Sequence, residues 1–213
     1  MIQILETYGF QLLKATGEHI FYVSVSVAIG FVIGLLLGIL LSRFPRFSFI
    51  VLPVVSIFQT IPGLVFIGIL FMYLGMRPAT VIIALSIYSV FPVMKNTYTG
   101  ILSVEDYYID AAKGCGMNSF QRLIRVELPL CVPNIITGLR MSAVYTVSWA
   151  VLAAMIGLGG LGTFIYQGTS SNNNTLILLG AVPAALLAVV IGFLIDLLLK
   201  KLTPRGLRKE VTK

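Results

Sequence analysis

The sequence predicts an all-helical membrane protein with about five spanning helices, and three observations support that prediction. Of the 213 residues, 58% are hydrophobic and only 11% are charged, and the mean hydropathy is +0.99. Soluble domains average about a quarter charged residues. The apolar residues also form stretches long enough for a bilayer core, which needs about 20 helical residues. Finally, most lysines and arginines lie beside the ends of those stretches.

The predicted spans are residues 20–41, 47–76, 79–94, 133–156 and 176–199. Such stretches are too apolar for the helices of a soluble core. Residues 1–17 mix Glu6 and Lys14 with apolar residues, and they lack the positive start of a secretory signal. We expect them to form a separate, uncleaved interfacial helix. The whole chain, 1–213, is expected to form a single transmembrane domain whose core is residues 20–202.

The positive charges predict the orientation, because connections rich in Lys and Arg stay in the cytoplasm. Of the 15 Lys and Arg residues, the opposite side receives only Lys14 and Arg77. The predicted cytoplasmic connections hold Arg43, Arg46, Lys95, Lys113, Arg122, Arg125, Lys200, Lys201, Arg205, Arg208, Lys209 and Lys213. The N-terminus is therefore expected outside and the C-terminus in the cytoplasm. The net charge of +7 follows this insertion pattern, so the expected partner is the lipid bilayer and not nucleic acid.

The sequence lacks the patterns of several kinds of catalytic site. No G-x-x-x-x-G-K-[ST] phosphate loop is present, so ATP is not bound by that route. Cys115 and Cys131 are far apart on the predicted cytoplasmic side, and His19 is the only histidine, which leaves no metal cluster or disulfide framework. We expect a chain that is not an enzyme and holds no cofactor.

The connection over residues 95–128 is unusually long and has internal order. Ser103 and Asp106 match a capping box, S-x-x-D, which predicts a helix that ends at a hinge made by Gly114 and Gly116. Asn118 and Gln121 predict a second helix, which Pro129 should stop. A plain solvated loop is the alternative.

A more specific sequence pattern lies in the same connection. It consists of DAAKGCG at residues 110–116, followed after nine residues by VELP at 126–129. They resemble the E-A-A-x-x-x-G-x9-I-x-L-P signature of permease subunits in bacterial ABC importers. The matching anchors are Asp110, Ala111, Ala112, Gly116, Val126, Leu128 and Pro129. Asp110 replaces the family's Glu and keeps its charge, while Val126 replaces Ile and keeps its branched shape.

The resemblance extends to YSVFPVMKNTYTGI before this loop and SWAVLAAMIGLGGLG after it, and it covers about residues 20–202. These segments look like the branch that imports glycine betaine, carnitine or choline. The resemblance implies a type I, methionine-importer-like permease fold in the bacterial cell membrane. Permeases for methionine or another small solute are the alternative within the class.

In such permeases residues 101–129 would form a cytoplasmic coupling loop. The resemblance implies that its first helix sits in a cleft of the ATPase subunit, which binds the ATP. Ala111 and Ala112 would allow close approach, and Glu105, Asp106 and Asp110 would accept bonds from basic residues of that partner. It also implies a second permease copy or a related permease, and an extracytoplasmic substrate-binding protein.

Two segments are candidates for the substrate path. Gln59, Pro62 and Gly63 predict a break within the second span, and broken helices at bilayer depth line cavities in transporters. A kink packed against a neighbouring helix is the alternative.

Ser142, Tyr145 and Trp149 share one face of the fourth span, where aromatic rings suit a quaternary ammonium cation. Ordinary helix packing is the alternative. Arg140 in the same span should snorkel to the cytoplasmic interface.

Functions of other classes are less compatible with these features. An ion-coupled secondary transporter would need ionisable residues inside the bilayer, and the spans hold only Arg140 and Asp196. A purely structural membrane subunit would not need the ordered loop.

Overall fold

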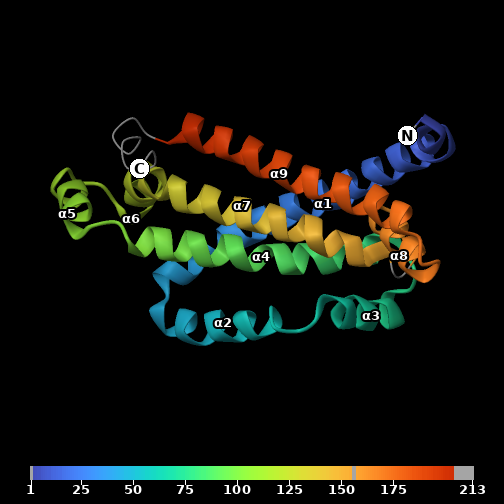
Figure 1. The fold of residues 1–213 in the computed structure, drawn as a ribbon. Coiled ribbons are helices and arrows are strands. Elements are labelled where there is room, and N and C mark those ends of the chain that lie inside the picture. The colour runs from blue at the N-terminus through green and yellow to red at the C-terminus, as the bar shows by residue number, and fades with distance from the viewer. Residues whose placement is uncertain (1, 155–156, 204–213) are drawn as a thin grey trace.

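The computed structural model describes residues 2–154 and 157–203, and every regular element in those ranges is a helix (Figure 1). In chain order they are α1 (Ile2–Arg43), α2 (Pro45–Phe58), α3 (Gly63–Leu74), α4 (Pro78–Leu102), α5 (Asp106–Gly114), α6 (Ser119–Arg122), the π-helical turn η1 (Leu123–Glu127), α7 (Leu128–Ala153), α8 (Gly162–Ser170) and α9 (Asn174–Leu202). The all-helical prediction is confirmed. The predicted end of the fourth span at residues 155 and 156, and the basic residues beyond 203, lie outside the described residues.

Four of the described helical runs are long and apolar enough to cross a membrane. They are α1, α4, α9 and the continuous run of α6, η1 and α7. Helices α2 and α3 form a fifth candidate span, bent by 91° where residues 59–62 separate them. The prediction of about five spans holds when this bent pair counts as one, and the predicted break before Gly63 is present.

The separate helix expected over residues 1–17 is wrong, because α1 runs without interruption from Ile2 to Arg43. It contains no proline, and its isolated glycines weaken a helix without ending it. At 1.5 Å per residue, this 42-residue helix is about 63 Å long, which is about twice the thickness of a bilayer's hydrocarbon core. Helix α1 therefore extends beyond the bilayer.

Helices α1, α4 and α7 form the centre of the bundle, and α9 packs on α7. Along α1, Gly30, Gly34 and Gly38 turn one glycine-lined face toward α4, and a Cβ on any of them would overlap atoms of α4. Small residues at this spacing let the backbones of membrane helices approach closely. Gly138 plays the same part on α7, where an added Cβ would lie 2.9 Å from the Pro92 carbonyl oxygen of α4.

Serine hydroxyls cross-link these three helices inside the core. Ser89 of α4 donates a hydrogen bond of 3.0 Å to the Ser26 carbonyl of α1. Ser142 of α7 donates one of 2.9 Å to the Ser89 carbonyl. Because a polar group in hydrocarbon needs a partner, these bonds specify how the helices are paired.

The snorkelling expected of Arg140 stays a prediction, and the structure adds a partner for its charge. Its Nε lies 3.0 Å from Oδ1 of Asp196, so the two charges of α7 and α9 neutralise each other. Such pairing lowers the cost of placing both charges near the hydrocarbon, and each side chain is about half exposed.

Two details of the cytoplasmic connection also differ from expectation. Ser103 does not cap α5: its hydroxyl donates to the Gly100 carbonyl at the end of α4, and Glu105 precedes α5 without any side-chain cap. Pro129 does not stop the second helix, because α6, η1 and α7 are continuous. The wider π turn ends where Leu128 donates to the Leu123 carbonyl, just before the proline that has no N–H to donate.

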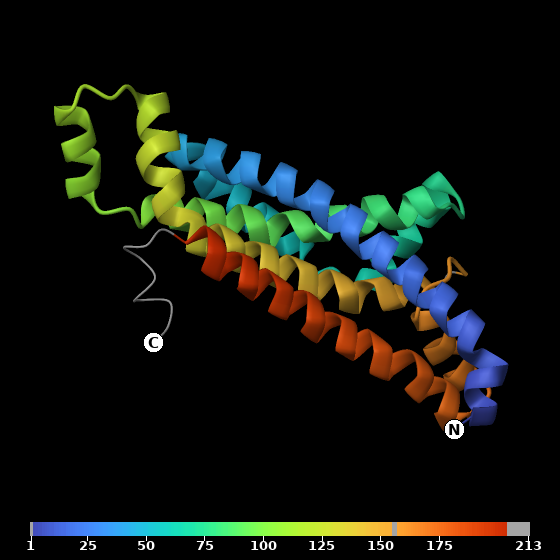
Figure 2. The ribbon, with the colours of Figure 1, turned by 90° about the horizontal axis from the view of Figure 1, so that it is seen from above.

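The capping box at Asn118 and Gln121 is confirmed, with reciprocal bonds of 2.9 and 3.0 Å. In both views α5 stands apart at one end of the bundle, whereas the N-terminal end of α1 and helix α8 lie at the other end (Figures 1 and 2). The connections predicted to face the cytoplasm and the outside are thus separated by the length of the bundle.

Replacing Gly34 by Ala should destabilise the bundle. The added Cβ would lie 2.7 Å from the Val90 carbonyl oxygen and 2.8 Å from the Val93 Cβ, so α1 and α4 must separate. Such overpacking costs about 1–3 kcal/mol. Thermal unfolding in detergent should show a lower midpoint, while Gly68→Ala, whose Cβ meets nothing within 4 Å, should not lower it. Equal midpoints for the two variants would contradict the close packing.

Candidate functional site

The break between α2 and α3 lies against α4 and is held there by two hydrogen bonds. The Gln59 side-chain amide donates a 3.0 Å bond to the Tyr88 carbonyl. The Tyr88 hydroxyl donates a 2.9 Å bond to the Ile61 carbonyl, which the interrupted helix leaves free. Non-helical backbone at membrane depth needs such partners. Tyr88 therefore anchors the break.

Aromatic rings from three helices meet at this point. The ring centroids of Tyr88 (α4) and Trp149 (α7) are 3.8 Å apart, and Phe66 (α3) meets the Tyr88 ring edge-on at 5.2 Å. Gly63 lies directly beneath the Trp149 ring, since a Cβ at that position would overlap the ring carbons. Only glycine lets the first turn of α3 approach α7 so closely.

A cavity of about 210 Å³ opens beside these rings. It is lined by Gln59, Tyr88, Tyr145, Thr146 and Trp149, and none of these carries a charge. A second cavity, of about 480 Å³ and almost wholly apolar, shares Gln59 and Tyr88 and runs between α1, α4 and the broken pair. We call the smaller one the aromatic cavity.

The structure gathers most of the predicted path residues at the aromatic cavity. Gln59, Tyr145 and Trp149 line it, and Pro62 and Gly63 form the adjoining turn. Ser142 does not reach it: the side chain is fully buried and bonded to α4. Sequence reasoning missed Tyr88 and Thr146, although Tyr88 begins the YSVFP segment and Thr146 follows Tyr145.

The predicted coupling residues form a second group at the α5 end of the molecule. Asp106 begins α5, where a negative charge stabilises the positive end of the helix dipole. Glu105, Asp106 and Asp110 are exposed, and Asp110 pairs with Lys113 at 2.9 Å on the surface. Three carboxylates are thus open to a partner.

The two alanines of α5 differ in placement. Ala111 is exposed, whereas Ala112 is 5% exposed and faces the chain itself. Val126 and Leu128 are half-buried in and after η1, and Pro129 follows in the first turn of α7. Only the Ala111 side of α5 offers a small-residue surface to another subunit.

Gly116 ends α5 instead of acting as a free hinge. Its φ is +75°, and the Gly116 and Met117 amides donate to the Lys113 and Ala112 carbonyls. This is the Schellman arrangement, in which a left-handed residue closes the helix and glycine has no Cβ penalty. The turn therefore holds α5 at a defined angle to α6.

A family model described as "Binding-protein-dependent transport system inner membrane component" matches residues 30–207. The chain belongs to this family. It is a non-enzymatic, multi-pass permease of a bacterial inner membrane, and ATP is hydrolysed by a separate subunit. Its system includes an ATPase and a binding protein as partners.

Several full-length relatives of this permease are at least 30% identical. The glycine betaine/carnitine/choline transport system permease protein OpuCB of Bacillus subtilis (strain 168) is 38% identical, with 100% of this chain and 99% of the relative covered. The carnitine transport permease protein OpuCB of Listeria monocytogenes is 37% identical over 98% and 96%. The osmoprotectant import permease protein OsmW of Salmonella typhimurium is 32% identical over 96% and 97%.

The fold of the permease is also that of solved transporters. An inward-facing structure of the MetNI methionine ABC transporter matches with a TM-score of 0.83 over 93% of this chain and 99% of that chain, at 23% identity. An amino acid ABC transporter solved with histidines matches with a TM-score of 0.75 at 16% identity. The methionine-importer-like fold predicted from the sequence is confirmed.

Replacing Gly63 by Ala should displace the Trp149 ring toward the aromatic cavity. Trp149 is the only tryptophan, so its fluorescence reports this contact directly. We expect tryptophan emission at longer wavelength, because the Trp149 ring would move away from the Tyr88 ring and toward the polar side chains of Gln59 and Thr146. The larger Gly63→Leu change should in addition lower transport while the subunits still assemble.

Gly68→Ala serves as the control, since it adds the same methyl group to α3 in open space. Identical emission spectra for the Gly63→Ala variant and the parent would contradict the contact between α3 and α7.

Proposed function

We propose that this permease forms the pathway for uptake of a quaternary-amine osmoprotectant: glycine betaine, carnitine or choline. The single observation that carries the proposal is the aromatic cavity beside the broken span. The full-length relatives, which are permeases of glycine betaine/carnitine/choline, carnitine and choline transport systems, support the same solutes.

The chemistry of the solute matches that cavity. A quaternary ammonium has no N–H to donate, so hydrogen bonds cannot select it, while ring faces attract its charge. Tyr88, Tyr145 and Trp149 supply three rings, and the lining holds no carboxylate that would retain the cation. Weak, charge-free attraction suits a passage, because the solute must leave as readily as it enters.

Methionine or another small solute is the alternative cargo, since the solved transporter of similar fold is a methionine ABC transporter. Methionine has a primary ammonium group, which favours hydrogen-bond acceptors over ring faces. An ion-coupled secondary transporter is the alternative mechanism. Arg140 and Asp196 pair with each other, so neither is poised to bind a coupling ion in the described structure.

In the proposed assembly this chain pairs with a second copy or with a related permease, because five spans are few to enclose a pathway. Helix α5 docks in a cleft of the ATPase through Ala111 and the carboxylates of Glu105, Asp106 and Asp110. Val126, Leu128 and Pro129 then join the docked segment to α7. The extracytoplasmic binding protein delivers the solute at the end that carries α8.

The solute is tested by uptake in vesicles that contain the permease with its ATPase and binding protein. Labelled glycine betaine, carnitine and choline should each be compared with methionine. Replacing Trp149 by Leu should lower uptake of the quaternary amines about tenfold, as loss of a desolvated cation–π contact implies, and Trp149→Phe should retain part of it. Phe193→Leu, which removes an exposed ring of α9, is the control. Uptake of methionine alone would overturn the proposal.

The coupling role is tested with two changes in α5. Ala111→Arg should place a bulky charge in the ATPase cleft, and Gly116→Val should open the turn, since a left-handed conformation costs a branched residue about 1–3 kcal/mol. Both variants should insert normally but lose the ATPase or hydrolyse ATP without uptake. Gly114→Ala is the matched control, because its Cβ meets nothing within 4 Å and its φ is not positive. Normal coupling in both variants would show that α5 is a solvated loop.

A further inference from the structure

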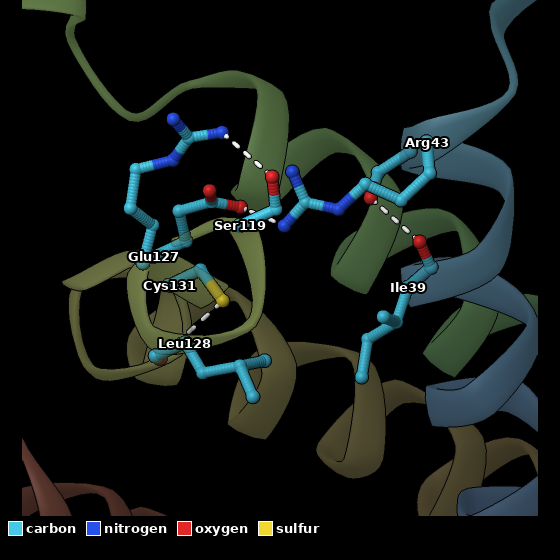
Figure 3. A network of polar contacts seen from close by, with 8 residues as sticks. Ile39, Arg43, Ser119, Glu127, Leu128 and Cys131 are labelled. Carbon is cyan, nitrogen blue, oxygen red and sulfur yellow. Dashed lines mark hydrogen bonds and ion pairs between the residues drawn. The ribbon is translucent and has the colours of Figure 1, made fainter. Parts of the chain in front are cut away.

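Arg43 and Glu127 form an ion pair where the end of α1 meets the π-helical turn η1. The Arg43 guanidinium donates to Oε2 of Glu127, whose side chain is 4% exposed. Figure 3 shows the two side chains reaching toward each other, one from α1 and one from the turn that leads into α7. Glu127 occupies the unspecified position of V-x-L-P, so the sequence motif assigns it no role.

The pair lies between the coupling segment and the broken span. Helix α5 packs against η1, which carries Glu127. Arg43 is the last residue of α1, and α2 begins at Pro45, after a single intervening residue. We call residues 43–45 the elbow. Helix α2 ends at Phe58, directly before Gln59 at the aromatic cavity, so a displacement of η1 can reach that cavity through the elbow and α2.

The helices at this end are already held together without the pair. Ile101, Cys131 and Ile135 form a buried apolar cluster of α4 and α7, and Leu35 and Ile39 of α1 pack against it. The glycine face of α1 at Gly30, Gly34 and Gly38 fixes this helix to α4. A buried ion pair is by itself weak evidence of added stability, because desolvation offsets the attraction.

Helix α2, by contrast, is loosely attached. Most of its described side chains are exposed in the chain, and it packs on little besides α1 and α4. An element with few buried contacts moves at low cost. The buried Ser48 shares a hydrogen bond of 3.0 Å with the Tyr98 hydroxyl of α4. Beyond that contact, the elbow holds the start of α2 and the bonds of Gln59 and Tyr88 hold its end.

We propose that the ion pair of Arg43 and Glu127 transmits ATP-driven movement of α5 to the elbow, and so to α2 and the aromatic cavity. This inference rests on the proposed coupling role of α5. An ion pair joins two defined atoms and follows their movement, whereas an apolar contact lets side chains slide. Arg43 and Glu127 are positioning residues: they touch neither the solute nor ATP.

The test replaces the pair by apolar residues of similar size, Arg43→Met with Glu127→Leu, in the assembled importer. In other proteins, replacing a buried ion pair by apolar residues leaves stability unchanged or raises it. If the pair of Arg43 and Glu127 were purely structural, the replacement would therefore cost neither stability nor transport. The matched control is Arg140→Met with Asp196→Leu, which removes the ion pair between α7 and α9, away from the coupling segment. Exchanging the charges, Arg43→Glu with Glu127→Arg, tests rescue.

Two measurements are needed. The first is the reaction of Thr60→Cys, an exposed position in the break, with a membrane-impermeant thiol reagent in the nucleotide-free and the ATP-vanadate-trapped complex. Cys115→Ser is the background, because Cys115 is exposed. The second is glycine betaine uptake per ATP hydrolysed. The first does not depend on the solute, so a parent that imports no quaternary amine would refute the proposed cargo and leave this inference testable.

We expect the importer with the apolar replacement to hydrolyse ATP and to unfold at the parent's temperature or above. It should nevertheless lose the nucleotide-dependent change in labelling at Thr60→Cys. Uptake per ATP should fall about tenfold, within the range that residues along a coupling route produce. The charge exchange should restore both. A normal labelling change and normal uptake in the apolar variant would overturn the proposal. Should that variant fail to insert, Glu127→Gln, which keeps the shape of the side chain, decides the same question.

Discussion

The close approach of α1 to α4 is the contact on which the rest of the structure depends. Gly30, Gly34 and Gly38 leave one stretch of α1 without side chains, and backbone and side-chain atoms of α4 occupy that space. In a lipid environment there is no hydrophobic force between helices, so this packing and the serine bonds to Ser26 and Ser89 are what pair them. Helix α7 joins the same centre through Gly138 and Ser142.

That rigid centre makes the broken span possible. Proline and glycine at bilayer depth leave carbonyls without helical partners, and an isolated broken helix would be unstable in hydrocarbon. Here Tyr88, fixed on α4, satisfies the Ile61 carbonyl and presents its ring to Trp149. The same residue therefore supports the backbone and lines the aromatic cavity, which explains why the break lies opposite α4 and α7.

The cytoplasmic end combines rigid and adjustable parts. Helix α5 is closed by the Gly116 turn and joined by α6 to the π turn, from which one continuous helix leads into the membrane. A rigid element of this kind passes a displacement on without dissipating it in loop flexing. The proposed link from Glu127 to Arg43 would extend that movement to the only pair of described membrane helices that is bent and loosely packed.

The sequence by itself determined the features that depend on local composition. Apolar length predicted the spans, Pro62 and Gly63 predicted the break, and Asn118 with Gln121 predicted the cap of α6. The tertiary structure decided whatever depends on a distant partner. Ser103 bonds backward to α4, Arg140 meets Asp196, and Tyr88 joins Gln59 and Trp149 at one cavity. The reason is physical: a side chain in hydrocarbon takes the nearest partner in space, and nothing in its neighbours along the chain specifies which helix supplies it.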